Sequence, residues 1–85
     1  MTTKEKVHKL WMENQVLMGN LSGRWASEKE YEDIRDYGEV LRPHVENAGG
    51  VFVKMLKRPF GFNLLMDGVK YRIWVSGNNY SYKEL

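Results

Sequence analysis

The chain has 85 residues, of which 42% are hydrophobic and 28% are charged, and it carries a net charge of +2 with no cysteine. This near-average composition excludes disordered and collagen-like classes, and the missing cysteine excludes disulfide frameworks and thiolate metal sites. No apolar run is long enough to span a membrane and none resembles a signal peptide, so we expect one cytoplasmic domain over residues 1–85 that does not associate with membranes.

The first expected element is a helix. Thr2 and Glu5 have the spacing of a capping box, in which each side chain accepts from the other residue's backbone amide. Apolar residues then recur at steps of three, four and seven, which predicts a helix over residues 3–18. Gly19 is expected to end it, and residues 19–26 are expected to form a loop held to the core by Leu21 and Trp25.

A second helix is expected after this loop. Ser27 and Glu30 repeat the capping-box spacing, and the apolar residues that follow have helical periodicity. Pro43 disfavours helical geometry at the residue before it, which predicts an end or kink at residues 41–42. A short piece over 43–48 is expected to follow, closed by the glycines at 49 and 50.

The strongest local signal is the Asp67-Gly68 pair, which is typical of a two-residue type I′ hairpin turn. This turn predicts that residue 66 faces 69, 64 faces 71, 62 faces 73 and 60 faces 75. All eight of these residues are apolar or aromatic, so we expect them on the core face. The other face of this hairpin is expected to carry Gly61, Asn63, Leu65, Lys70, Arg72 and Trp74.

Two further strands are expected around the hairpin. In a strand over 51–57, a tight connection at Arg58-Pro59 directs Val51, Val53 and Met55 to the core and Phe52, Lys54 and Leu56 outward. A looser loop or a cis peptide bond at Pro59 is the alternative. After a turn at 76–79, Tyr80 and Tyr82 are expected on the core face of a short edge strand.

Together these elements predict an α+β fold in the order ααββββ. Two N-terminal helices are expected to pack on one face of a three- to four-stranded antiparallel meander, which makes a two-layer domain.

No pattern in the sequence points to catalysis. His8 has Glu5 three residues before it, but carboxylate–histidine metal sites need further ligands from other helices. The carboxylates of residues 28–39 are spread around an exposed helix and lack the concave site that shifts catalytic pKa values. We therefore expect a protein that is not an enzyme and that uses no cofactor or metal.

The outward side of the sheet is the main candidate for binding, because large apolar and basic residues share it. The predicted partner-binding residues are Phe52, Lys54, Leu56, Leu65, Lys70, Arg72 and Trp74. This side could pack on another protein, or on a second copy to form a homodimer. Alternatively, the N-terminal segment or the loop with Trp25 could cover it, or it could simply be exposed.

Charge marks a second candidate surface. Residues 28–49 carry seven carboxylates against three bases, and residues 50–85 carry six bases against two carboxylates. Such polarity suits docking by charge complementarity, although a solvated acidic helix gives the same pattern. The predicted acidic surface consists of Glu28, Glu32, Asp33, Asp36 and Glu39.

We therefore expect a small non-enzymatic interaction protein that binds and inhibits another macromolecule, most simply a protein. Its size and lack of catalytic motifs fit the accessory or inhibitory proteins that phages and mobile elements encode. The alternative is a nucleic-acid-binding module that uses the basic and aromatic side of the sheet, although no RNA-recognition motif is present and the second helix is acidic.

Overall fold

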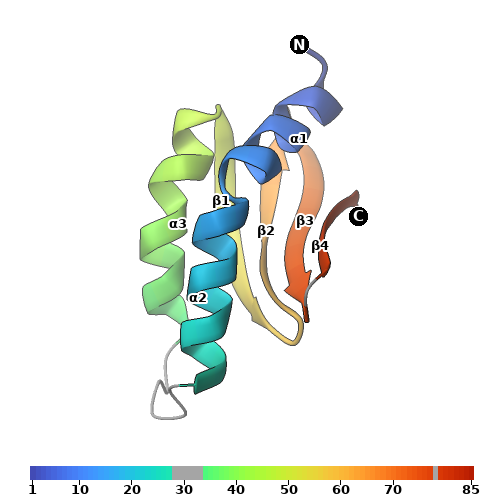
Figure 1. Cartoon of the computed structure of the whole chain (residues 1–85). Helices are drawn as coiled ribbons and strands as arrows, with labels where there is room; N and C mark the ends of the chain where they lie inside the picture. The colour runs from blue at the N-terminus through green and yellow to red at the C-terminus, as the bar shows by residue number, and fades with distance from the viewer. Residues whose placement is uncertain (28–33, 78) are drawn as a thin grey trace.

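The computed structural model describes residues 1–27, 34–77 and 79–85. Three helices precede four strands along the chain (Figure 1). The elements are α1 (Thr3–Glu13), α2 (Gln15–Ser27), α3 (Arg35–Asn47), β1 (Gly50–Lys57), β2 (Phe60–Met66), β3 (Val69–Ser76) and β4 (Asn79–Glu84). The strands form one antiparallel sheet in the order β1-β2-β3-β4, with the helices against one face. The predicted α+β two-layer architecture is confirmed, with three helices in place of two.

The capping box at the start of α1 is confirmed. The Thr2 hydroxyl accepts from the Glu5 amide at 3.2 Å, and the Glu5 carboxylate accepts from the Thr2 amide at 3.3 Å. The predicted extent of this helix is wrong, because α1 ends at Glu13 and α2 begins directly after Asn14. The buried Asn14 side chain donates to the Leu10 carbonyl at 2.9 Å at this break.

The predicted loop over residues 19–26 is also wrong, because these residues belong to α2. Gly19 does not end the helix; it lies where α2 passes β4, and an added Cβ would be 2.6 Å from the Tyr80 hydroxyl oxygen. Met18 and Leu21 are buried on the inner side of α2. Packing of this side outweighs the roughly 1 kcal/mol that each glycine costs inside a helix.

Ser27 lies in α2 rather than in a loop before the next helix. It is the last residue of α2, and its hydroxyl donates to the carbonyls of Gly23 and Arg24 at 3.0 and 3.2 Å. Its expected capping partner, Glu30, lies outside the described residues.

The predicted end of the helix at residues 41–42 is wrong, because α3 continues through Pro43 to Asn47. Pro43 lies on the exposed side of α3, where water can reach the carbonyl that loses its amide partner. On the opposite side Leu41 and Val45 are fully buried, and this packing holds the helix together across the proline. The glycine at 49 ends the helical segment as expected, with φ at 88°.

The hairpin prediction is confirmed in turn type and register. Asp67 and Gly68 have φ values of 53° and 79°, and Met66 pairs with Val69. The pairs further from the turn are Leu64 with Tyr71, Phe62 with Ile73 and Phe60 with Val75. Seven of these eight residues are buried, and Val69 is half-buried.

The turn is also tied to the N-terminal helix. Thr3 donates to the Asp67 carboxylate at 2.7 Å, and Lys6 lies 3.1 Å from it. The hydrogen bond from Thr3 and then that from Lys6 hold the pKa of Asp67 below its ordinary value of 3.8.

The predicted orientation of β1 is wrong over its first half. Phe52 pairs with Leu64 but Lys54 pairs with Asn63, so Val53 is an extra residue in a β-bulge. Phe52 therefore faces the core, with its ring stacked 5.5 Å from that of Phe62.

Val51 faces outward, with 58% of its surface exposed, and Val53 is 43% exposed. Beyond the bulge the prediction holds, since Met55 packs on the core and Lys54 and Leu56 share the outward side.

Strand β4 closes the sheet with both tyrosines on the core face, as predicted. Tyr80 pairs with Val75 and Tyr82 with Ile73. Tyr82 also joins β4 to α1, because its hydroxyl lies 2.8 Å from His8 Nδ1.

The sequence leaves two geometries open for the connection at Arg58-Pro59, and in the structure this peptide bond is cis. Within the described ranges, no helix combines the length and apolar character needed to cross a bilayer.

Candidate interaction surface

The side of the sheet opposite the helices is uncovered in the described structure (Figure 1). Its outward residues, here called the outer sheet face, form three cross-strand rows. The rows are Val51–Leu65–Lys70, Lys54–Asn63–Arg72–Lys83 and Leu56–Gly61–Trp74–Ser81.

The predicted internal covers of this face lie elsewhere. Trp25 packs edge-on against Tyr37 of α3, with ring centroids 5.8 Å apart. The N-terminal helix α1 lies on the core side, where Trp11 contacts Tyr82 at a centroid distance of 5.4 Å. Neither the N-terminal segment nor Trp25 therefore shields the outer sheet face.

The outer sheet face combines apolar side chains with positive charge. Val51 is largely exposed, while Leu56, Leu65 and Trp74 are half-buried. The face carries four cationic side chains, Lys54, Lys70, Arg72 and Lys83, and its three rows contain no Asp or Glu. Among the described residues, none of these cations forms an ion pair within 4 Å.

Two contacts fix the centre of this face. Arg72 Nε donates to the Oδ1 atom of Asn63 at 3.1 Å, and Asn63 is only 5% exposed. Lys83 Nζ lies 5.9 Å from the centroid of the Trp74 ring, within range of a cation–π contact. These contacts hold Arg72 and Lys83 close to the sheet.

Most of the residues predicted for binding occupy this face, but Phe52 does not. Lys54, Leu56, Leu65, Lys70, Arg72 and Trp74 lie on it as expected. The bulge turns Phe52 inward and brings Val51 outward in its place. Lys83 was missed because β4 extends beyond the Tyr80–Tyr82 segment that alternation alone predicts.

The second predicted surface is only partly described. Glu28, Glu32 and Asp33 lie outside the described residues. Asp36 and Glu39 are exposed on α3, where Glu39 lies 3.7 Å from Arg42. The described turns of this helix therefore mix both signs of charge.

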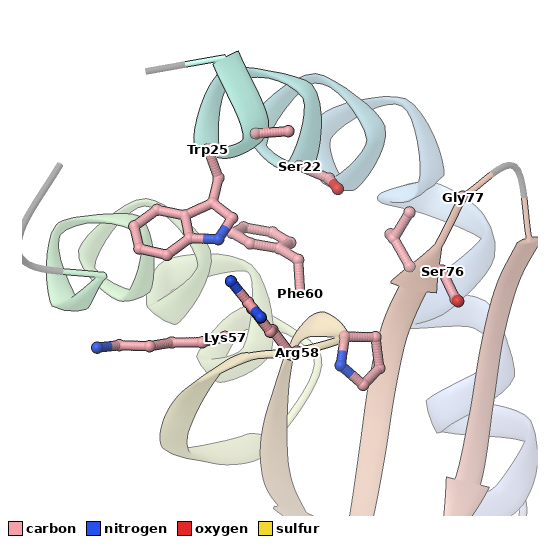
Figure 2. A pocket seen from close by; sticks show the side chains of 10 residues that line it. Ser22, Trp25, Lys57, Arg58, Phe60, Ser76 and Gly77 are labelled. Atoms are coloured by element: carbon pink, nitrogen blue, oxygen red, sulfur yellow. The ribbon is translucent and has the colours of Figure 1, made fainter. Parts of the chain in front are cut away.

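A hollow also occurs at one end of the molecule, and we call it the end pocket (Figure 2). It has a volume of about 580 Å³ and lies between the last turns of α2 and the turns that follow β1 and β3. Its walls include Ser22, Trp25, Lys57, Arg58, Phe60 and Ser76. No carboxylate or imidazole is among its described lining residues.

The two histidines and Tyr71 lie away from this pocket. His8 contacts Tyr82, and His44 is an exposed residue of α3. Burial raises the pKa of Tyr71, with smaller contributions from the negative charges of Glu84 and Tyr82. Across the part of the chain that the structure describes, no three His, Asp or Glu side chains gather where they could hold a metal ion.

Comparison with known proteins assigns no relatives: no family model, no curated protein and no solved structure matches this chain.

Proposed function

We propose that this chain is a non-enzymatic binding protein that presses its outer sheet face against an acidic surface of another protein and thereby blocks that surface. One observation carries the proposal. The outer sheet face is uncovered, and it places four cations without ion pairs in the described structure among partly exposed apolar side chains.

The residue types on this face support protein docking. Tryptophan and arginine are enriched among the residues that dominate interface energies, and Trp74 and Arg72 lie on adjacent rows of β3. The apolar residues Val51, Leu56 and Leu65 flank them and can exclude water from the contact. The cations would steer an acidic partner and set its orientation.

The size of the face indicates how far the contact extends. Strand spacings of about 4.8 Å and residue rises of about 3.3 Å give three rows on four strands a footprint of roughly 400 Å². A standard interface buries about 800 Å² per partner. The partner should therefore also contact neighbouring residues, of which Val53 at the bulge is 43% exposed.

Charge argues against a second copy as the occupant. Stacking two outer sheet faces would oppose four cations with four cations and bring no Asp or Glu side chain between them. Like charges opposed across an interface are unfavourable, whereas an acidic partner gains attraction at the same positions. The predicted homodimer is therefore the weaker reading of this surface.

The arrangement of aromatic rings favours a protein over nucleic acid. Proteins that bind single strands stack successive bases on several exposed rings. Only Trp74 offers a ring on the outer sheet face, because Phe52 is turned into the core, and Lys83 already lies over that ring. The experiment must therefore distinguish an acidic protein partner from a nucleic-acid ligand.

The test compares three anionic probes of similar length: a random Glu/Tyr copolymer, polyglutamate and oligothymidylate. Binding is followed by amide chemical-shift changes in ¹⁵N-labelled protein at moderate salt. We expect the Glu/Tyr copolymer to bind most tightly and to shift signals along β2 and β3. Trp74→Ala should weaken it about tenfold or more, as expected for loss of a central anchor.

Charge reversal supplies a matched pair of variants. Arg72→Glu removes a cation from the outer sheet face, and Lys4→Glu makes the same change on the exposed side of α1. Only Arg72→Glu should weaken copolymer binding. The proposal would be overturned if oligothymidylate bound more tightly than the Glu/Tyr copolymer, or if both charge reversals weakened copolymer binding equally. It would also be overturned if light scattering showed a dimer that persists at high salt.

A further inference from the structure

We propose that the end pocket binds a small anion that carries a flat ring, of the nucleoside monophosphate class. The pocket lies apart from the outer sheet face. Lys57 and Phe60 pair across the β1–β2 turn, and Phe60 belongs to the core that the helices cover. This site is therefore independent of the function proposed above.

The charge of the pocket selects an anion. Lys57 and Arg58 are adjacent, exposed and without an ion pair among the described residues. In Figure 2 the Arg58 guanidinium rises into the hollow toward Trp25, and Lys57 runs beneath the same ring. A phosphate suits this pair, because guanidinium groups bind phosphate oxygens through two parallel hydrogen bonds.

The walls supply a place for a ring. Trp25 hangs from α2 over the hollow, and Phe60 lies beside it (Figure 2). Tyr37 holds both rings in place, because Trp25 and Phe60 each pack edge-on against it, at centroid distances of 5.8 and 5.6 Å. A flat heterocycle can lie against the indole while its phosphate reaches Arg58.

Hydroxyl groups complete the lining. Ser22 and Ser76 come from α2 and β3 on either side of the hollow, and each offers a donor and an acceptor to a sugar or a ring. The carbonyl end of α2 is partly neutralised, because the Ser27 hydroxyl donates to the Gly23 and Arg24 carbonyls. This reduces the repulsion that a helix C-terminus exerts on an anion.

The volume indicates a ligand larger than a simple ion. About 580 Å³ falls within the roughly 300–1,000 Å³ of typical small-molecule sites, and a lone phosphate would fill only a small part of it. An anion with a ring uses both the cations and the aromatic wall.

The test titrates ¹⁵N-labelled protein with adenosine monophosphate. The indole N–H signals of Trp11, Trp25 and Trp74 report three separate places on the molecule. We expect the Trp25 signal to move and to saturate below about 10 mM nucleotide, together with the amides of residues 57–60 and 76–77. The other two indole signals should stay in place.

A matched pair of variants assigns the site. Arg58→Gln should raise the Kd at least tenfold, whereas Lys70→Gln removes the same charge from the outer sheet face and should leave the Kd unchanged. Both residues are exposed, so both variants should keep the thermal midpoint of the parent. If both variants raised the Kd for adenosine monophosphate equally, the binding would be non-specific charge attraction and the proposal would be overturned.

Two fragments of the probe test the ligand class. Adenosine and inorganic phosphate should each bind at least tenfold more weakly than adenosine monophosphate, because each engages one half of the pocket. Phosphate binding as tightly as the nucleotide would overturn the role of the ring. An unmoved Trp25 signal at saturating nucleotide would overturn the site itself.

Discussion

The bulge in β1 makes a prediction that exchanges the roles of two neighbouring residues. Strict alternation from the Arg58-Pro59 connection buries Val51 and exposes Phe52, whereas the structure exposes Val51 and turns Phe52 inward. Truncating each residue to alanine therefore measures which side chain is part of the core. The same two alanine variants show whether Val51 or Phe52 belongs to the outer sheet face.

The expected costs follow from the contacts. Burying a phenylalanine contributes about 1.5–3 kcal/mol when complete, so a half-buried ring contributes about half of that. Stacking on Phe62 at 5.5 Å adds about 0.5–1.5 kcal/mol. Phe52→Ala should thus lower the free energy of unfolding by about 1–3 kcal/mol. Val51→Ala, at a site 58% exposed, should lower it by about 0.5 kcal/mol.

Urea unfolding followed by circular dichroism measures both changes. With a slope of about 1 kcal/mol per molar urea for a small domain, Phe52→Ala should move the midpoint by about 2 M and Val51→Ala by about 0.5 M. Binding of the Glu/Tyr copolymer should show the reverse order, with Val51→Ala the more harmful variant. A larger loss of stability in Val51→Ala than in Phe52→Ala would refute the bulged register.

Two further variants test the hairpin. Asp67→Asn keeps a residue that the type I′ turn accepts but removes the carboxylate that Thr3 and Lys6 contact. Because these contacts lower the folded-state pKa below 3.8, their stabilisation is present above that pH and is lost as the pH falls through the folded value. The parent should therefore be more stable than Asp67→Asn near pH 7, and the urea midpoints of the two proteins should converge as the pH falls through the folded-state pKa of Asp67. A difference in midpoint that acid leaves unchanged would contradict the ion pair. Gly61→Ala should cost at least about 3 kcal/mol, because the new Cβ would meet the backbone of β3, including the Cα of Trp74 at 2.7 Å. A thermal midpoint equal to that of the parent would show that the two strands are less closely packed.

The two proposed sites differ in how far the sequence could reveal them. Alternation around the hairpin turn correctly placed Leu65, Lys70, Arg72 and Trp74 on one side of the sheet. The end pocket could not be found in this way. Lys57 and Arg58 are neighbours in the chain, but Trp25 reaches them only because residues 19–26 are helical.

The elements that the sequence determined by itself are those specified by local geometry. The pair Asp67-Gly68 accepts the positive φ values of a type I′ turn, and the two-residue period of a strand then sets the register of β2 and β3. The Thr2 and Glu5 capping box likewise needs only four consecutive residues to satisfy the start of α1.

Tertiary structure decided the features in which long-range packing opposed a local preference. Gly19 and Pro43 favour helix ends, yet burial of Met18 and Leu41 on the sheet keeps α2 and α3 intact around them. The bulge has the same origin. No residue near Val53 signals it, but a Phe52 ring stacked on Phe62 buries far more apolar surface than Val51 could. Local signals act over a few residues, whereas the contacts that overrode them join segments that only the folded chain brings together.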